Sequence, residues 1–452
     1  MQAPWQTFKL SRTLYPTPEE SVNAAPRNRL PFGQIIWRAL SLPLLSHTIP
    51  GTLRRVTAPV ASILDSQLLS DVTILEWGEF ISVPTCGRLL ADMGADVIKL
   101  EPPDGDIARK APPFIRSKGG PEASALFQHL NMGKRGITLD ISSTKDLAKL
   151  HTLLNTVDVL VEGQRPALME ALGLDHAGLR KRHPQLNVVS VTPFGKTGPR
   201  RDWHGADIVI WAMSGIATAH PRFVPKPGMQ PLAMPGYAAD TLAGYYASSA
   251  VMAALVRRWR TGEPSLADLS ALDLLLSILH VRIAGYDYEG KVIPRVGETP
   301  PSRTVPWGLY PCKDGYVGLF VVQDAQWQGL IRAMGKPDWA LTPLFAGYNG
   351  RAEHGPELTA LLKTWLDAHT MLDIYERCMA NDVPSCAIVP FKDVERNPQL
   401  LARKAWEVVR HPRLGKLPVL RPPYRWAGQR WSPKRFAPRL GEHNKAILGA
   451  GT

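Results

Sequence analysis

The sequence predicts an α/β protein with a Rossmann-like, mostly parallel sheet in a large domain, accompanied by a smaller α+β domain. From Val72 onward, short apolar runs alternate with helical stretches, which is typical of parallel strands joined by crossover helices. The 452 residues, 44% of them hydrophobic, can form a large core and are too many for one simple domain. The 41 prolines and 37 glycines follow no period, as in a globular chain with many loops.

The predicted elements of the large domain follow one another as strand–helix units. We predict strands at 72–75, 97–100, 136–141, 157–161 and 187–191, and helices at 84–93, 145–154 and 168–172. A long helix is predicted at 241–260, because an Ala- and Leu-rich run starts there after Asp240 and ends before Gly262. The turn at 78–87 lacks the GxGxxG spacing, so the sheet carries no nicotinamide-binding signature.

The smaller domain is expected after residue 285. The pattern loosens into Gly and Pro between Tyr286 and Trp307, and then predicts a strand at 315–320 and helices at 326–334 and 357–368. We therefore assign 1–70 to an N-terminal extension, 71–285 with 395–452 to the large domain, and 286–394 to the small domain with its linkers.

Composition excludes several classes of protein. The four cysteines, at positions 86, 312, 378 and 386, form no CxxC or Cys/His group, so neither a disulfide framework nor a zinc site is predicted. The carboxylates of Asp104 and Asp106 lie in a predicted turn that needs no metal ion. Apolar runs fall short of the roughly 20 residues that a membrane span requires. We expect a protein of a reducing compartment, the cytoplasm.

The net charge of +13 is concentrated near the chain ends. Residues 401–452 hold twelve Lys and Arg against two Asp and Glu, a bias that raises nucleic-acid binding as an alternative, testable by a steep salt dependence of DNA affinity. Because Pro and Trp interleave these basic residues, a solvated surface without a nucleic-acid partner is the preferred interpretation.

The N-terminal extension has a bias of its own. Residues 21–64 contain five arginines and no acidic residue, which resembles an organellar transit sequence and makes a mitochondrial location the alternative. Prolines at positions 26, 31, 43 and 50 interrupt any long amphipathic helix there, so we favour an extension that lies over the folded body.

Ordered motifs carry a resemblance to a known family. They include CGRLLADMGADVIKLEPPDGD at 86–106, NMGKRGITLD at 131–140, FGKTGP at 194–199, RTG at 260–262 and LGEHN at 440–444. Residues 71–452 thus resemble one monomer of the class III CoA-transferases, the CaiB/BaiF group with formyl-CoA transferase and L-carnitine CoA-transferase. The resemblance implies coenzyme A transfer from an acyl-CoA to a carboxylic acid without a metal, in an interlocked homodimer.

Asp240 has two interpretations. By position alone, an Asp before an apolar helix is an N-cap that accepts backbone N–H bonds. The family resemblance implies instead a catalytic nucleophile, whose carboxylate attacks an acyl-CoA thioester and passes through an aspartyl thioester. We expect the helix N-terminus to keep this carboxylate ionised.

The resemblance also implies a set of coenzyme A contacts. They are Ile81, Ser82, Lys134, Leu139, Asp140, Gly163, Gln164, Arg165, Ala206 and Asp207. Compared with the formyl-CoA branch, Ile81 replaces a glutamine, Gly163-Gln164 replaces Asn-Phe, and Pro102 and Ala171 replace arginines. Arginine binds phosphate in bidentate fashion, so Lys134, Arg135 or Arg165 is expected to substitute.

Three enzymatic alternatives share this scaffold: an acyl-CoA isomerase, a racemase or a lyase, none of which needs a second carboxylic acid. The racemase branch places a proton-transferring histidine at position 206, where this chain has alanine, so racemisation is disfavoured. A non-catalytic CoA-binding paralogue is a further alternative, because the cofactor positions are altered and the N-terminal extension is present.

Overall fold

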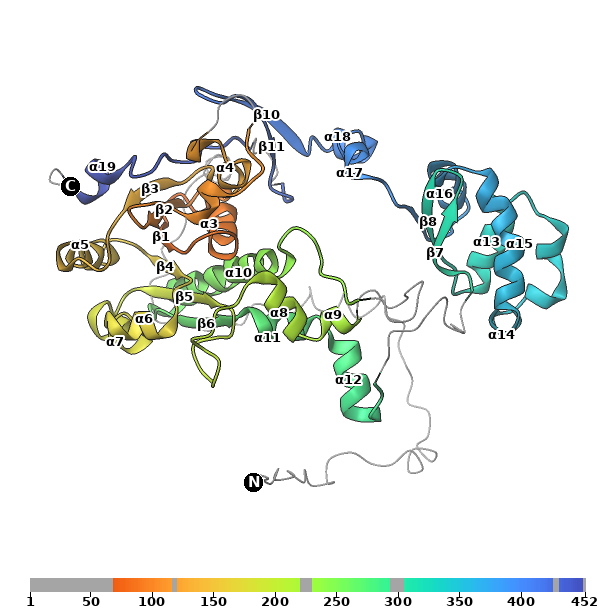
Figure 1. Ribbon diagram of the computed structural model, residues 1–452, viewed down its shortest axis with the longest axis horizontal. Coiled ribbons are helices and arrows are strands. Elements are labelled where there is room, and N and C mark those ends of the chain that lie inside the picture. The colour runs from red at the N-terminus through yellow and green to blue at the C-terminus, as the bar shows by residue number, and fades with distance from the viewer. Residues whose placement is uncertain (1–67, 116–119, 220–229, 293–304, 426–430, 450–452) are drawn as a thin grey trace, which may run out of the picture. The chain divides into compact units, whose positions relative to one another are not determined.

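The structure is a computed structural model that describes residues 68–115, 120–219, 230–292, 305–425 and 431–449 (Figure 1). The expectations for residues 1–67 lie outside the described residues. Within the described part of the chain, every helix is too short or too polar to cross a lipid bilayer.

Six parallel strands form the central sheet, in the order β3-β2-β1-β4-β5-β6. They are β1 (Thr73–Trp77), β2 (Asp96–Glu101), β3 (Arg135–Thr138), β4 (Val159–Glu162), β5 (Asn187–Thr192) and β6 (Leu266–Ser270). From β1 the chain builds outward to β3 on one side and then from β4 to β6 on the other. The strand order therefore reverses between β1 and β4, and ligands of open α/β sheets bind at the carboxyl ends of the strands at such a point.

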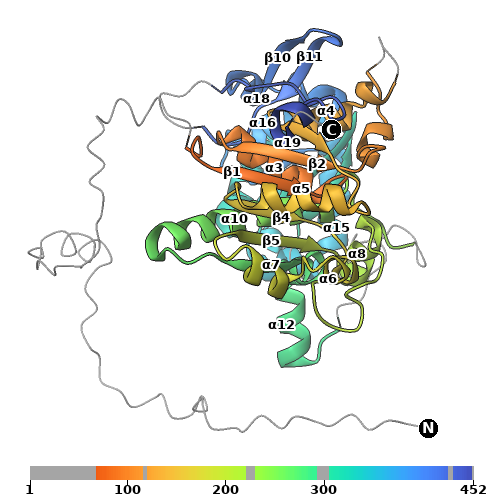
Figure 2. The same cartoon turned by 90° about the vertical axis from the view of Figure 1, so that its left-hand side faces the viewer.

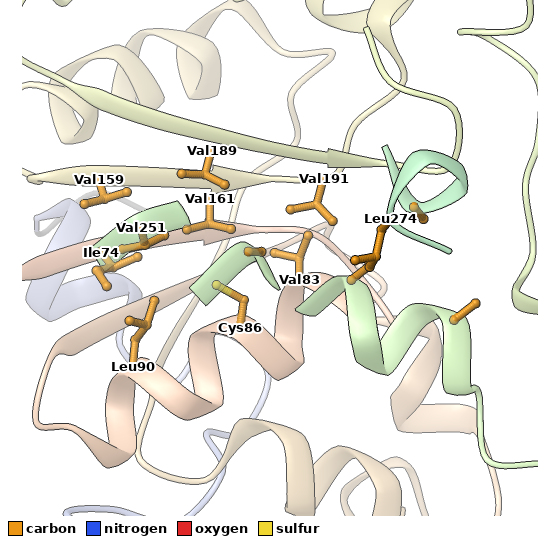
Figure 3. Close-up of a cluster of buried hydrophobic side chains, with 14 of the residues drawn as sticks. Ile74, Val83, Cys86, Leu90, Val159, Val161, Val189, Val191, Val251 and Leu274 are labelled. Carbon is orange, nitrogen blue, oxygen red and sulfur yellow. The ribbon is translucent and has the colours of Figure 1, made fainter. Parts of the chain in front are cut away.

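Helices cover both faces of this sheet. On one face lie α3 (Ser82–Asp92), α8 (Asp207–Met213), α9 (Ile216–Ala219), α10 (Ala238–Thr261) and α11 (Ala271–Ser277); on the other lie α5 (Thr144–Leu154), α6 (Pro166–Ala171) and α7 (His176–Arg182). Figure 3 shows the core of the first face, where strand residues point toward helix residues Val83, Cys86, Leu90 and Val251. The predicted Rossmann-like sheet is confirmed.

Helices α3 and α10 approach closely at Gly244. A Cβ at this position would lie 2.5 Å from the carbonyl oxygen of Ser82 and 2.6 Å from Cβ of Thr85, so no larger residue fits without displacing α3. This contact fixes the start of α10 beside the start of α3.

The C-terminal segment returns to the large domain. Strands β10 (Trp406–His411) and β11 (Gly415–Leu420) form an antiparallel hairpin whose buried face packs with Ala123 and Met132, which flank α4 (Ala125–Asn131). Farther along, at the start of α19 (Asn444–Leu448), Gly136 N–H donates to His443 Nδ1 at 3.1 Å and Thr138 N–H donates to Asn444 Oδ1 at 2.9 Å. The C-terminal residues thus complete the edge of the sheet at β3.

The predicted smaller α+β fold is confirmed as well. Its three-stranded antiparallel sheet consists of β7 (Trp307–Cys312), β8 (Gly315–Phe320) and β9 (Ser385–Ala387). Its helices are α13 (Asp324–Ala333), α14 (Tyr348–Glu353), α15 (Gly355–Ala368) and α16 (Met371–Met379), and it has a separate core that contains Trp327, Phe345 and Leu362. The connecting helices are α12 (His280–Glu289), α17 (Phe391–Val394) and α18 (Pro398–Ala402).

Candidate active site

A pocket of about 820 Å³ lies at the carboxyl ends of β1, β4 and β5, at the point where the strand order reverses. The loop after β1 gives one wall, the loop after β4 a second, and the starts of α8 and α10 a third. The lining residues are Glu79, Phe80, Ile81, Ser82, Ile107, Gly163, Gln164, Val191, Thr192, Pro193, Gly205, Ala206, Asp207, Ile208, Ala233, Met234, Gly236, Tyr237, Asp240, Ala243 and Ala271. Its volume suits a small-molecule ligand.

Asp240 lies in the first turn of α10, as the third residue of the helix. The interpretation of Asp240 as the N-cap is wrong, because α10 begins at Ala238 and its N-cap is Tyr237. The side chain of Asp240 lines the pocket and is half-buried. It is therefore placed to meet a ligand there.

A second carboxylate stands next to Asp240. The backbone N–H of Asp240 donates to Asp207 Oδ1 at 3.1 Å, so Asp207 satisfies one of the free donors at the start of α10. Burial, and then the charge of Asp207, raise the pKa of Asp240 to about 6. Burial and a like charge thus outweigh the effect of the helix start on this pKa, although a value of about 6 still leaves the carboxyl mostly ionised at pH 7 to 8.

Two residues beside Asp240 have left-handed backbones. Phe80 has φ of 65° and Tyr237 has φ of 55°, a region that non-glycine residues enter at a cost of about 1–2 kcal/mol. Their rings meet edge to face with centroids 4.8 Å apart. Phe80 N–H also donates to Asp106 Oδ1 at 3.0 Å. The ring contact between Phe80 and Tyr237 joins the loop after β1 to the residue that precedes α10.

A network of buried charged side chains contacts the loop after β1. Lys99 Nζ contacts Glu76 Oε1 at 3.2 Å, Asp106 Oδ2 at 2.8 Å and the carbonyl oxygen of Gly78 at 3.1 Å. These three charged side chains are fully buried, so losing one partner would leave an uncompensated charge. The network fixes the backbone that presents Phe80 and Ile81.

The hydroxyl of Thr192 is a polar group without a hydrogen-bond partner among the described residues. Thr192 is the last residue of β5, lines the pocket and is 3% exposed. Gly163, which also lines the pocket, has no room for a side chain, because a Cβ there would lie 2.9 Å from Cγ2 of Val83. Buried hydroxyl groups are normally paired, and a ligand in the pocket would satisfy this one.

The pocket gathers most of the residues named from the sequence. Asp240, Ile81, Ser82, Gly163, Gln164, Ala206 and Asp207 all line it. Leu139 and Asp140 follow β3 at the same edge of the sheet but outside the pocket, with Leu139 buried under α5 and Asp140 exposed. Arg165 precedes α6, is exposed, and has no ion pair among the described residues.

Lys134 lies in the protein interior. Its Nζ donates to Glu76 Oε2 at 2.6 Å, Asn131 Oδ1 at 2.9 Å and the carbonyl oxygen of Pro84 at 2.9 Å. These contacts use all three ammonium donors, and burial lowers the pKa of Lys134 to about 8. Arg135 is engaged by Asp96 at the opposite ends of the strands. Neither placement supports phosphate binding in the pocket.

The sequence reasoning missed Glu79, Phe80, Thr192 and Tyr237. Thr192 carried a usable signal, because it ends a buried strand at the edge where ligands bind. The left-handed conformations of Phe80 and Tyr237 carried none, since both residue types usually avoid them.

Comparison with known proteins decides the family. The model of CoA-transferase family III matches residues 69–444. This chain belongs to that family. It is 31% identical to the succinate–glutarate CoA-transferase of Agrobacterium fabrum over 84% of this chain and 94% of the relative. It is 32% identical to the succinyl-CoA–D-citramalate CoA-transferase of Chloroflexus aurantiacus, over 84% and 93%. A CaiB/BaiF family protein of Brucella suis matches in structure with a TM-score of 0.72 at 30% identity, over 83% and 97%.

Family membership confirms the predicted enzyme class. The protein is a family III CoA-transferase, which moves coenzyme A from an acyl-CoA to a carboxylic acid. Coenzyme A thioesters are thus its small-molecule substrates. Among the described residues, no group of three His, Cys, Asp or Glu side chains is placed to hold a metal ion.

Proposed function

We propose that this CoA-transferase works through an aspartyl thioester on Asp240. The Asp240 carboxylate attacks the thioester carbonyl of the donor, forming a mixed anhydride and releasing CoA thiolate. The thiolate then attacks the aspartyl carbonyl, which gives the Asp240–CoA thioester and frees the donor acid. The acceptor carboxylate reverses both steps, so acyl-CoA leaves and Asp240 is regenerated.

The position and pKa of Asp240 carry this proposal. The carboxylate lines the pocket, and its pKa of about 6 leaves it mostly ionised at pH 7 to 8 while making it more basic than an ordinary aspartate. A more basic carboxylate is a better nucleophile, provided that it is still ionised. Asp207 contributes to both properties through its charge and its bond to the Asp240 N–H.

We further propose that the pocket holds the thioester end of coenzyme A. Ile81, Ser82, Gly163, Gln164, Ala206 and Asp207 line it. The hydroxyl of Thr192, which has no partner among the described residues, offers a donor for the thioester carbonyl oxygen. Leu139, Asp140 and Arg165 lie outside the pocket, and we propose them as contacts for the nucleotide end. Arg165 is the candidate phosphate ligand among them, because its guanidinium is exposed and has no ion pair within the described residues.

Succinyl-CoA is the first donor to assay. Two of the relatives are named for succinate or succinyl-CoA, and each covers more than 90% of its own length in the match with this chain. A panel of carboxylic acids as acceptors, glutarate first, would then define the second substrate.

We propose a homodimer as the active form. Helix α12 projects from the sheet in Figures 1 and 2, and none of its residues is buried. Val281, Tyr286 and Tyr288 on it are 71%, 61% and 89% exposed. Apolar side chains gathered in this way mark a contact surface. Light scattering should give the dimer mass, and the monomer mass at micromolar concentration would contradict this proposal.

A cytoplasmic location is proposed with it. All four cysteines are unpaired thiols, as expected in a reducing compartment.

Kinetics of three variants test the role of Asp240. Asp240→Ala and Asp240→Asn should lose CoA transfer by at least about a thousandfold, as expected when a covalent nucleophile is removed. The exposed Asp338 of the small domain gives a matched control, since Asp338→Ala leaves the pocket and α12 intact. CoA transfer that survives in Asp240→Ala would overturn the mechanism.

A further inference from the structure

A second cavity lies in the large domain, near the edge strand β3. It has a volume of about 490 Å³ and shares no residue with the Asp240 pocket. Its walls come from the end of β10 and the following turn, from α4 with the residues before it, and from the C-terminal segment. The lining residues are Glu122, Gln128, His411, Pro412, Arg413, Leu414, Lys434, Arg435, Phe436, Ala437, Arg439, Glu442 and His443. Figures 1 and 2 show β10 and β11 beside α4.

The walls of this cavity are held by hydrogen bonds to the sheet. Arg109 Nη2 donates to the carbonyl oxygen of Pro438 at 3.0 Å, and Gly133 N–H donates to that of Arg435 at 3.0 Å. His443 is held by the bond from Gly136 N–H. A cavity with fixed walls binds a ligand at a smaller entropic cost than a loose one.

Cationic side chains dominate the lining. Lys434 donates to the carbonyl oxygen of Gly94 at 2.6 Å, and Arg435 contacts Asp96 at 3.3 Å. Burial, followed by the charge of Arg435, lowers the pKa of Lys434. Arg413 is exposed and has no ion pair among the described residues.

The acidic residues of the lining are already engaged. Glu122 lies 3.3 Å from Nη1 of the buried Arg109, and Glu442 lies 3.6 Å from Arg439 while accepting the backbone N–H of Arg439. His411 accepts N–H bonds from Arg413 and Leu414 on Nδ1, at 3.1 Å and 3.0 Å, so its remaining N–H is on Nε2. The free charge that is left on the lining is positive.

The side-chain oxygen of Gln128 is a lining acceptor without a hydrogen-bond donor among the described residues. Gln128 on α4 is 5% exposed, and its Nε2 donates to the carbonyl oxygen of Glu122 at 3.1 Å. Its Oε1 has no partner within the described part of the chain. A buried amide oxygen without a partner is costly, so a ligand that carries an N–H group would stabilise the site.

We propose that this cavity binds a nucleotide, with phosphate on Arg413 and a base N–H on Gln128 Oε1. The rings of Phe436 and His411, whose centroids lie 4.6 Å apart, supply an aromatic wall against which a base can pack. Phosphate recognition by arginine and base recognition by an amide together define the class. A free nucleotide and the 3′-phospho-ADP end of a coenzyme A molecule other than the one in the Asp240 pocket share this chemistry.

Titration calorimetry on the full chain tests the site with ADP, coenzyme A and inorganic phosphate as separate probes. Arg413→Ala and Gln128→Leu should each weaken ADP binding by about tenfold or more, whereas phosphate should weaken only in Arg413→Ala. Arg410→Ala is the matched control, since Arg410 is an exposed arginine of β10 outside the cavity. If coenzyme A shows a binding step that disappears in Arg413→Ala, coenzyme A is the ligand of the cavity. If coenzyme A shows no such step, the ligand is a free nucleotide.

Two results would overturn the proposal: no ADP binding at about 1 mM, where even a weak site is occupied, or ADP binding that is equal in the parent, Arg413→Ala and Gln128→Leu. If Gln128→Leu fails to fold, ADP binding is compared in Arg413→Ala and Arg439→Ala instead, since both arginines are exposed. CoA transfer should be unchanged in Arg413→Ala, so this result stands apart from the role of Asp240.

Discussion

The backbone N–H of Asp240 donates to Asp207 Oδ1 at 3.1 Å, which brings two carboxyl groups together at the start of α10. This bond fixes the helix start, while burial and then the charge of Asp207 raise the pKa of the proposed nucleophile. Asp207 belongs to α8 and Asp240 to α10, so the pair exists only in the folded chain.

Replacing Asp207 should shift the pH profile of the enzyme. Asp207→Asn keeps the oxygen that accepts the Asp240 N–H but removes the charge, so the pKa of Asp240 should fall from about 6 toward its ordinary value. Since Asp240 must be ionised to attack, the acid limb of kcat/KM should move to lower pH. Asp202→Asn is the control, because Asp202 accepts the N–H of Ala167 near α6 in the same way but outside the pocket. An acid limb that stays in place would show that Asp207 does not act on Asp240.

Asp240→Asn should stabilise the protein at pH 8. The folded pKa of about 6 exceeds the unfolded value, so the stability that this carboxyl contributes is present below about pH 4 and is lost as pH rises through 6. At pH 8 the free energy of unfolding of the variant should exceed that of the parent by about 1–3 kcal/mol. Urea titration at both pH values measures this, and an equal gain at pH 4 would contradict the electrostatic cause.

The left-handed backbone of Tyr237 predicts an unusual order of substitutions. Tyr237→Gly should be more stable than Tyr237→Ala by about 1 kcal/mol, because glycine adopts this conformation without a Cβ clash. At Tyr245, an exposed position inside α10, the order should reverse by a similar amount, since glycine weakens a helix interior. Thermal unfolding of the four variants checks both orders. If alanine is the more stable residue at both positions, the φ of Tyr237 carries no cost.

Removing the hydroxyl of Thr192 should impair catalysis rather than folding. Thr192→Val keeps the shape and should lower kcat/KM by about tenfold, the worth of one hydrogen bond to the substrate. Thr192→Ser retains the hydroxyl and should keep most of the activity. If Thr192→Val is fully active, the hydroxyl does not contact substrate.

The sequence was sufficient for most of the sheet and for placing Asp240 at the start of a long helix, because both depend on local patterns. The buried strands β1, β2, β4 and β5 each contain a short apolar run, and the motifs around residues 86–106 and 131–140 identify the family. Strand β6 was missed since its sequence LADLS contains an aspartate and a serine and is only partly buried. Its pairing with β5 supplies what its composition does not.

The finer parts of the site depended on tertiary contacts. Lys134 appeared suitable for binding phosphate, yet Glu76, which precedes it by 58 positions in the chain, holds it in the core. The pKa of Asp240 depends on how deeply α10 is buried and on the approach of Asp207. Neither the distance nor the burial can be read from residue spacing.

The aspartyl thioester itself is the most direct object of measurement. The enzyme should be incubated with succinyl-CoA without an acceptor, treated with hydroxylamine, digested and examined by mass spectrometry. The account predicts a hydroxamate on Asp240 alone, formed only when the acyl-CoA is present. An unmodified Asp240 in an enzyme that turns over, or a hydroxamate on another residue, would contradict it.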